Sequence, residues 1–257
     1  PIRHERNRGA GGAIKTGYLR AIDDGVDVVV TIDADGQMDP AEMSRVVDPV
    51  VDGVADYAKG NRLVQPTARG EMPPFRWLGN WTLTLLTKVA SGYWRTRDPQ
   101  NGYTAVSRRA LLAVDVPSLF DDFGYSNDLL ARLNAAEMRV ADVPMASAYG
   151  DEESSIRLWS YVPKVSFVLA RCFLWRLKAR YLSGRLHPLA VCYLLGLVGV
   201  VVGLAYAVAA VTAGAAPGWV AVGALATIPV LVVSGLFTAV GMAFDRWASR
   251  GLEVRLE

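Results

Sequence analysis

The sequence predicts an α/β protein whose mostly parallel sheet and flanking helices are followed by interfacial helices and a two-helix transmembrane hairpin. Short β-branched runs alternate with helical stripes over residues 1–150, which favours a parallel sheet. A basic and aromatic segment follows at residues 151–186. Residues 187–244 then contain no Asp, Glu, Lys or Arg, which leaves room for two apolar helices of about 20 residues each.

The composition excludes several classes of protein. A chain of 257 residues with a net charge of +2 is neither an acidic nor a strongly basic binding protein. Its two cysteines, Cys172 and Cys192, lie among apolar residues and have no histidine or cysteine at ligand spacing. We therefore expect both to be packing residues, without a disulfide framework.

A glycine-rich turn at residues 7–13 opens the first predicted helix, in which apolar residues recur at helical spacing. Such a turn places backbone N–H groups and a helix N-terminus near a bound anion, with Asn7, Arg8 and Gly9 as candidates. A tight connection that simply uses glycine explains the same residues, so both interpretations stay open. The turn is not a P-loop, because no Gly-Lys-Ser/Thr follows it.

The most informative stretch is a β-branched run at residues 26–32 that ends in Asp33 and Asp35. It predicts a buried strand that delivers two carboxylates to its C-terminal edge, where ligands bind in open α/β sheets. Two such acids, with Gln37, can hold a hard divalent cation, although short Asp-x-Asp strings are also common without function. Asp39 is not included among the candidate metal ligands. The Pro and Glu that follow it are typical of the first turn of a helix, which makes Asp39 the expected N-cap residue.

Further polar residues follow the next predicted elements. Arg62 comes directly after a predicted strand at residues 56–60, near the proposed metal edge. A predicted helix at residues 75–90 carries Arg76 and Asn80 near its start.

Two more acids lie downstream. Asp98 belongs to a polar loop before a strand predicted at residues 102–107. Asp128 lies in the first turn of a helix predicted at residues 127–137. An acid at that position also favours the helix dipole, so helix stabilisation and catalysis both remain open.

The C-terminal part predicts membrane attachment. Residues 156–185 carry seven Lys or Arg and no acid, interleaved with aromatic residues, which suits an anionic membrane interface. Nucleic-acid binding is disfavoured, because the apolar hairpin follows immediately. Arginines flank both outer ends of the hairpin, whereas its turn at residues 214–218 is uncharged. The positive-inside rule therefore places both flanks in the cytoplasm and makes residues 245–257 a cytoplasmic tail.

With these residues laid out, the chain resembles family 2 glycosyltransferases of the GT-A (nucleotide-diphospho-sugar transferase) fold. The likeness is greatest to the polyprenyl-phosphate sugar transferases, the dolichol-phosphate mannosyltransferase-like group. The matching stretches are residues 7–18, 31–37, 60–62, 98–103 and 154–157. Such proteins normally begin with a strand ending in a Pro-x-(Tyr/Asn)-Glu segment, which is absent here. The resemblance thus implies that residues 1–150 are a GT-A-like domain lacking its N-terminal portion.

The resemblance implies roles for the residues at matching positions, with Mg²⁺ or Mn²⁺ as the metal. The expected metal ligands are Asp33, Asp35 and Gln37. The expected donor-binding residues are Asn7, Arg8, Gly9, Asp33 and Asp35. The expected acceptor-phosphate residues are Arg62, Arg76 and Asn80. The expected catalytic residues are Asp35, Asp98 and Asp128.

The activity that the resemblance implies is inverting, metal-dependent transfer of one sugar from a UDP- or GDP-sugar to a polyprenyl phosphate at the cell membrane. The Gln-x-x-Arg-Trp signature of processive polysaccharide synthases is absent, which favours a single transfer. Two alternatives stay open: another glycolipid or a cell-envelope glycan as acceptor, or a non-catalytic, truncated membrane module. Association with other copies of the chain is also left open.

Overall fold

The computed structural model describes residues 1–34, 36, 38–62, 74–122, 124–145, 158–183, 187–212 and 217–256. Side chains are described for the same residues except 74–81, 158–163, 210, 211 and 217–226. The chain divides into two units. The first comprises Pro1–Arg176 and Ser249–Glu257, and the second comprises Leu177–Ala248.

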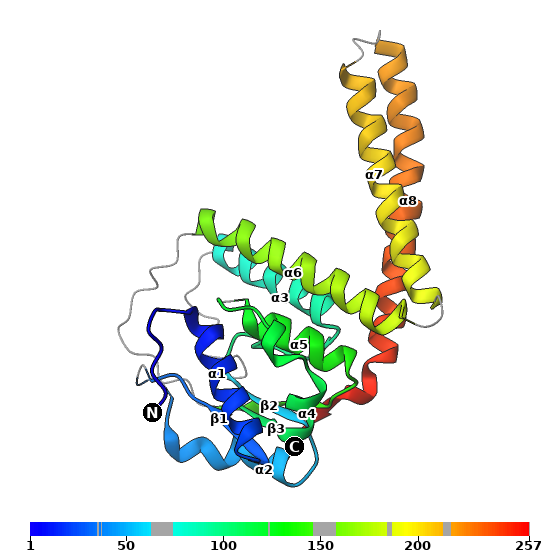
Figure 1. Ribbon diagram of the computed structural model, residues 1–257. Helices are drawn as coiled ribbons and strands as arrows, with labels where there is room; N and C mark the ends of the chain where they lie inside the picture. Colours follow the sequence, from blue (N-terminus) through cyan, green and yellow to red (C-terminus); the bar gives the residue numbers. More distant parts are fainter. Residues whose placement is uncertain are drawn as a thin grey trace. The chain divides into compact units, whose positions relative to one another are not determined.

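The first unit is built on a five-stranded sheet in the order β1-β3-β2-β4-β5 (Figure 1). The strands are β1 (Val28–Thr31), β2 (Tyr57–Asn61), β3 (Thr104–Ser107), β4 (Val140–Pro144) and β5 (Glu253–Arg255). β3 is antiparallel to β1 and β2, whereas β4 is parallel to β2 and to β5. The predicted α/β fold is confirmed, and its sheet is mixed: β3 runs opposite to the other four strands, which share one direction.

Helices cover both faces of this sheet (Figure 1). Those of the first unit are α1 (Gly9–Asp23), α2 (Met43–Val51), α3 (Pro74–Ser91), α4 (Arg108–Ala113), α5 (Tyr125–Ala135) and most of α6 (Leu158–Tyr181). Successive strand residues point to opposite faces. Tyr57 and Val106 pack in one buried cluster with α1, α4 and α5, and Ala58 and Ala105 pack in another with α2.

The short strand β5 was not expected, because the sequence predicts a cytoplasmic tail over residues 245–257. Instead, Val254 pairs in parallel with Ala141 of β4 and packs, with Leu256, against the cluster under α2. Apolar and charged residues alternate from Leu252 to Glu257, which is the signal of a half-buried strand.

The second unit contains α7 (Pro188–Thr212) and α8 (Pro217–Ala248), which lie side by side (Figure 1). Judged by length and composition, Pro188–Ala209 and Thr227–Ala248 could each cross a membrane. A Cβ on Gly196 would stand 3.0 Å from the Ser234 carbonyl, so the glycine lets the helices approach closely.

Candidate functional site

The candidate site lies where three segments meet at one edge of the sheet. β1 and β2 run in the same direction and β3 runs in the opposite one. Thr31 near the end of β1 and Lys59 of β2 both lie opposite Thr104, where β3 begins. The residues after β1, the residues after β2 and the loop before β3 therefore gather at this edge.

The Asp33 carboxylate packs directly on the loop before β3. A Cβ built on Gly102 would overlap both carboxylate oxygens of Asp33, so a side chain at position 102 would require the Asp33 carboxylate to move. Residues just after β1 line an open pocket of about 610 Å³: Ile32, Asp33, Ala34, Gly36, Met38, Asp39 and Pro40. Asp35 and Gln37 lie outside the described residues.

Asp39 has the structural role that the sequence predicts. Its carboxylate accepts a hydrogen bond of 2.9 Å from the Ala41 backbone, at the start of the 3₁₀ helix η1 (Pro40–Glu42). This is an N-cap contact. This contact supports leaving Asp39 out of the candidate metal ligands.

Arg62 and Asp98, predicted to act separately, form an ion pair. The Arg62 Nε donates to the Asp98 Oδ2 at 3.0 Å. The same oxygen accepts from the Arg62 backbone N–H and from the Asn101 Nδ2, each at 3.4 Å. The Arg62 side chain is 35% exposed whereas that of Asp98 is 10% exposed. The buried carboxylate thus holds a partly exposed guanidinium at the sheet edge.

Lys59 belongs to this network, although the sequence did not lead us to it. Its side chain is fully buried, donates to the Asp98 carbonyl at 2.7 Å and pairs with the Asp142 Oδ1 at 2.9 Å. The Asp142 Oδ2 in turn accepts from the Asn61 Nδ2 at 3.3 Å and the Arg97 backbone at 2.9 Å. A buried ammonium requires such partners. A lysine in the middle of a short predicted strand was the available signal.

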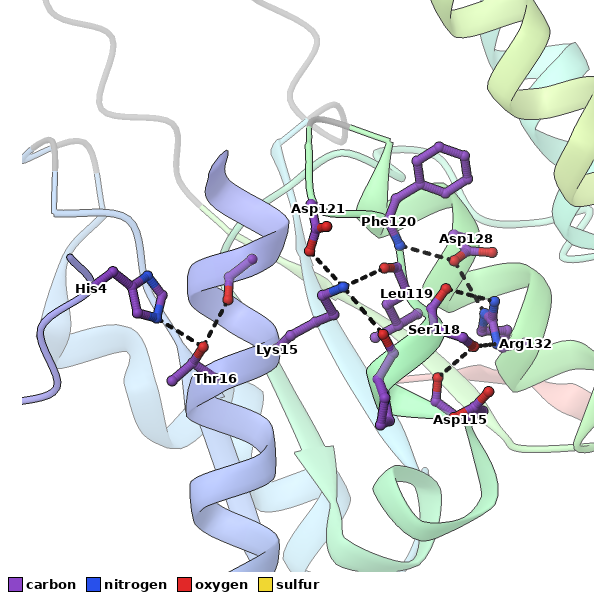
Figure 2. Close-up of polar contacts among 12 residues, drawn as sticks. His4, Lys15, Thr16, Asp115, Ser118, Leu119, Phe120, Asp121, Asp128 and Arg132 are labelled. Carbon is purple, nitrogen blue, oxygen red and sulfur yellow. Dashed lines mark hydrogen bonds and ion pairs between the residues drawn. The ribbon is translucent and has the colours of Figure 1, made fainter. Parts of the chain in front are cut away.

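Asp128 lies at the start of α5 and is 4% exposed. Its Oδ2 accepts from the Phe120 backbone at 3.2 Å and from the Arg132 Nε at 3.1 Å (Figure 2). Burial raises the pKa of Asp128, although the charge of Arg132 acts in the opposite direction. These contacts tie the loop before α5 to the helix, which is a structural role. Catalysis by Asp128 stays a prediction.

The glycine-rich N-terminus of α1 is covered by backbone from the loop at residues 120–122. The Gly12 N–H donates to the Asp121 carbonyl at 2.9 Å. A Cβ on Gly9 would stand 2.5 Å from that carbonyl, and one on Gly11 would overlap the Phe120 carbonyl. The glycines therefore permit close packing of α1 on this loop. This packing favours the interpretation of residues 7–13 as a tight connection.

Two side chains complete this contact. Lys15 donates to the Leu119 carbonyl at 2.7 Å and pairs with Asp121, whose pKa is lowered mainly by the hydrogen bond from Lys15 (Figure 2). The Asn7 Oδ1 accepts from the Gly9 N–H at 2.8 Å. Donor binding by Asn7, Arg8 and Gly9 stays a prediction.

The helix α3 carries Arg76 and Asn80 in its first turns, where the backbone alone is described. Its other end is held by Arg176, a fully buried residue that the sequence did not single out. The Arg176 Nε donates to the Ala90 carbonyl at 3.0 Å and its Nη1 donates to Asn134 at 3.1 Å. A cation at the C-terminus of a helix also interacts favourably with the helix dipole.

Of the three predicted metal ligands, only Asp33 lies within the described residues. Within the described ranges, no three His, Cys, Asp or Glu side chains form a group that could hold a metal ion. The two other predicted ligands, Asp35 and Gln37, are outside those ranges. Asp33 itself offers an oxygen donor at the sheet edge, which is the ligand type that Mg²⁺ and Mn²⁺ prefer.

Comparison with known proteins identifies relatives of this chain. It is 32% identical over 148 residues to UDP-N-acetylglucosamine–dolichyl-phosphate N-acetylglucosaminyltransferase of Methanococcus voltae, which covers 58% of this chain and 59% of that protein. It is 33% identical over 145 residues to polyprenol monophosphomannose synthase of Mycolicibacterium smegmatis, which covers 53% of this chain and 51% of that protein. The chain thus spans less than two thirds of these relatives.

A solved structure of glucosyl-3-phosphoglycerate synthase from Mycobacterium tuberculosis, with Mn²⁺, UDP-glucose and phosphoglyceric acid, is also similar. The TM-score is 0.46 and the identity 20%, over 68% of this chain and 56% of that chain. The family model described as glycosyl transferase family 2 matches residues 1–114, a range that contains α1, β1, β2, β3 and the whole candidate sheet edge. Residues 1–114 are therefore similar to the glycosyl transferase family 2 domain.

Proposed function

We propose that this protein is a membrane-bound glycosyltransferase that moves one sugar from a nucleotide sugar to a polyprenyl phosphate, with inversion at the anomeric carbon. The observation that carries the proposal is the sheet edge, where Arg62, Asp98 and Asp33 come together from three segments. The family 2 match covers these residues, and two relatives are named for transfer to dolichyl phosphate or synthesis of polyprenol monophosphomannose.

The residues at this edge suit a phosphate acceptor. A phosphate is already ionised near neutral pH, so the site needs alignment and charge stabilisation more than a general base. An arginine presents several N–H donors in a planar fork that matches phosphate oxygens. Asp98 holds the Arg62 guanidinium through Nε, which orients that fork. Arg76 and Asn80 on α3 are proposed to contact the same acceptor phosphate.

The donor diphosphate is proposed to bind beside Asp33, with Asn7, Arg8 and Gly9 nearby in the same role. Asp33, Asp35 and Gln37 would hold Mg²⁺ or Mn²⁺ through oxygen atoms. When bound, the metal would act as a Lewis acid that stabilises the nucleoside diphosphate as it leaves. Asp35, Asp98 and Asp128 are the acids of this chain proposed to act in catalysis.

Membrane attachment is supported by two parts of the chain. α7 and α8 contain stretches apolar enough to span a bilayer. On α6, Phe167 is 70% exposed and Leu174 is 54% exposed, one turn on either side of the exposed Arg171. Apolar and basic side chains on one helix face suit the surface of an anionic membrane. We propose a multi-pass protein with its glycosyltransferase domain in the cytoplasm, where nucleotide sugars would be the donors.

The test uses membranes from cells that express the full gene product. They are incubated with Mg²⁺ or Mn²⁺, a polyprenyl phosphate and a panel of radiolabelled UDP- and GDP-sugars, and label in the organic extract is counted. We expect label from one donor and its loss in Asp35→Asn, while Asp52→Asn, which changes an exposed acid at the end of α2, retains it. No lipid-linked label from any donor would overturn the proposal and direct the search to another glycolipid or glycan acceptor.

A further inference from the structure

The loop at residues 94–97 connects α3 to Asp98, and acidic side chains from two strands hold it by its backbone. The Arg97 N–H donates to the Asp142 Oδ2 of β4 at 2.9 Å. The Arg95 N–H donates to the Glu253 Oε1 of β5, 158 residues away in the chain. The Thr96 backbone also donates to Glu253. Each residue of the loop after Trp94 is thus bonded to one of two carboxylates.

The parallel register explains why these acids meet the same loop. Lys59 of β2, Asp142 of β4 and Arg255 of β5 lie in one row across the sheet. Glu253 lies opposite Val140, two residues before Asp142, so both acids point to the same face. Together with the loop they line an open pocket of about 630 Å³. The charged side chains lie in this part of the face only, because Tyr57 and Val140 on the same face belong to a buried apolar cluster.

The hydrogen bonds that hold the loop are connected to those of the candidate site. Asp98 is the next residue after the loop, and its carbonyl accepts from the buried Lys59, which also pairs with Asp142. Its carboxylate holds Arg62. The position of Asp98, and with it the direction of the Arg62 guanidinium, therefore depends on where the loop is held.

We propose that Glu253, on the C-terminal strand β5, is a positioning residue for this site. It fixes the loop that leads into Asp98. The inference rests on the proposed function of the site. Glu253 contacts neither substrate; it acts through the Arg95 and Thr96 backbone. These N–H bonds favour its ionised form, although burial raises the pKa of Glu253 overall.

The test compares two substitutions of nearly equal size. Glu253→Leu removes both oxygens, whereas Glu253→Gln keeps an oxygen that accepts from the same N–H groups. Arg255→Ala, on the same strand with an exposed side chain, is the control. Amide hydrogen exchange of the purified protein is followed by mass spectrometry for residues 94–101, and sugar transfer is measured on the same samples. If Glu253→Leu does not fold, Glu253→Ala supplies the same comparison.

We expect at least about tenfold faster exchange of the loop in Glu253→Leu, with exchange elsewhere in the sheet unchanged. We expect kcat to fall about tenfold because the loop displaces Asp98 and Arg62, with the KM of the donor within about twofold. Glu253→Gln should restore both. Equal exchange in wild type and Glu253→Leu would overturn the inference whether or not the protein transfers sugar. Faster exchange with an unchanged kcat would also overturn it, whereas absence of transfer in the wild type would fail only the proposed function.

Discussion

At the scale of single residues, the candidate site depends on cations that carboxylates from other segments hold in place. Asp98 binds Arg62, and Asp142 binds the buried Lys59. A charge-assisted hydrogen bond is stronger than a neutral one, and it fixes direction as well as distance. The site is therefore sensitive to the loss of either member of each pair.

Arg62→Ala should raise the apparent KM for polyprenyl phosphate. Loss of a charge-assisted contact costs about 1.5–3 kcal/mol, which corresponds to about 10- to 100-fold. Arg62→Lys should recover part of this, because lysine keeps the charge but not the planar fork. The measurement is initial rate against lipid concentration, with Arg45→Ala on α2 as control. An increase confined to the KM of the nucleotide sugar would show that Arg62 contacts the donor instead.

The ion pair between Lys15 and Asp121 predicts a pH-dependent stability. The hydrogen bond from Lys15 lowers the pKa of Asp121 in the folded chain below its unfolded value of about 3.9. Its contribution is therefore present above that value and is lost as the pH falls through the folded pKa. Asp121→Asn should lower the Tm at pH 6, and the difference from wild type should shrink below about pH 4.

The measurement is thermal unfolding in detergent, followed by circular dichroism at several pH values. Asp52→Asn changes an exposed acid at the end of α2 and serves as the control. A Tm difference for Asp121→Asn that is the same at pH 6 and pH 3 would contradict the assigned ion pair.

The sequence predicted individual residues of the site better than their pairing. Asp33 and Arg62 were expected at the carboxyl ends of strands, and the structure has them there. The ion pair with Asp98 and the role of Lys59 were not expected. Those contacts depend on β3 running antiparallel between β1 and β2, which no local pattern in the sequence reveals. The roles of Asp35, Gln37, Arg76 and Asn80 stay predictions.

At the scale of elements, the packing of α1 shows how backbone contact selects glycine. Gly11 lies where any side chain would meet the Phe120 carbonyl, whereas nothing lies within 4 Å of the Cβ position on Gly17 in the same helix. The same residue type is therefore required at one position and dispensable at the other.

Gly11→Ala should reduce the free energy of unfolding by about 1–3 kcal/mol, since the loop must move to admit the methyl group. Gly17→Ala should increase it by about 0.5–1 kcal/mol, because alanine loses less entropy in a helix. Unfolding of both variants by denaturant, in the same detergent, gives the comparison. A Gly11→Ala protein as stable as Gly17→Ala would show that the loop accommodates a side chain.

The strands and helices themselves were largely predictable. Periodicity indicated the helices, a β-branched run indicated β1, and a loose alternation of apolar residues over 140–148 indicated β4. β5 was missed because a short charged segment after an apolar helix matches the pattern of a cytoplasmic flank. The alternation of Leu252, Val254 and Leu256 with charged residues was the signal for a strand. Val254 pairs with β4, and Val254 and Leu256 pack against the buried cluster, as expected of a half-buried strand.

At the scale of the whole molecule, the apolar helices interrupt a single folded unit. Residues before Leu177 and residues from Ser249 onward belong to the same unit, although α7 and α8 lie between them in the sequence. In the proposed topology, both connections to the hairpin therefore emerge on the same side of the membrane. This agrees with the arginines that flank both outer ends.

That arrangement predicts where single cysteines react. In a chain with Cys172 and Cys192 replaced by serine, Ala215→Cys, between α7 and α8, should react with a membrane-impermeant maleimide on intact cells. Asp52→Cys, on the exposed end of α2, should react only after permeabilisation. Gel-shift labelling before and after permeabilisation makes the comparison. Labelling of both sites on intact cells, or of neither, would contradict the proposed topology.

The late position of β5 also sets an order for biosynthesis. The ribosome releases β1 to β4 well before it synthesises β5, because all of α7 and α8 is translated in between. Domains begin to fold from the N-terminus during translation. β5 and the acid that binds the Asp98 loop arrive only after the hairpin has left the ribosome. The hydrogen bonds between β4 and β5 are therefore made only after α7 and α8 have been synthesised, and a chain stalled before that point lacks them.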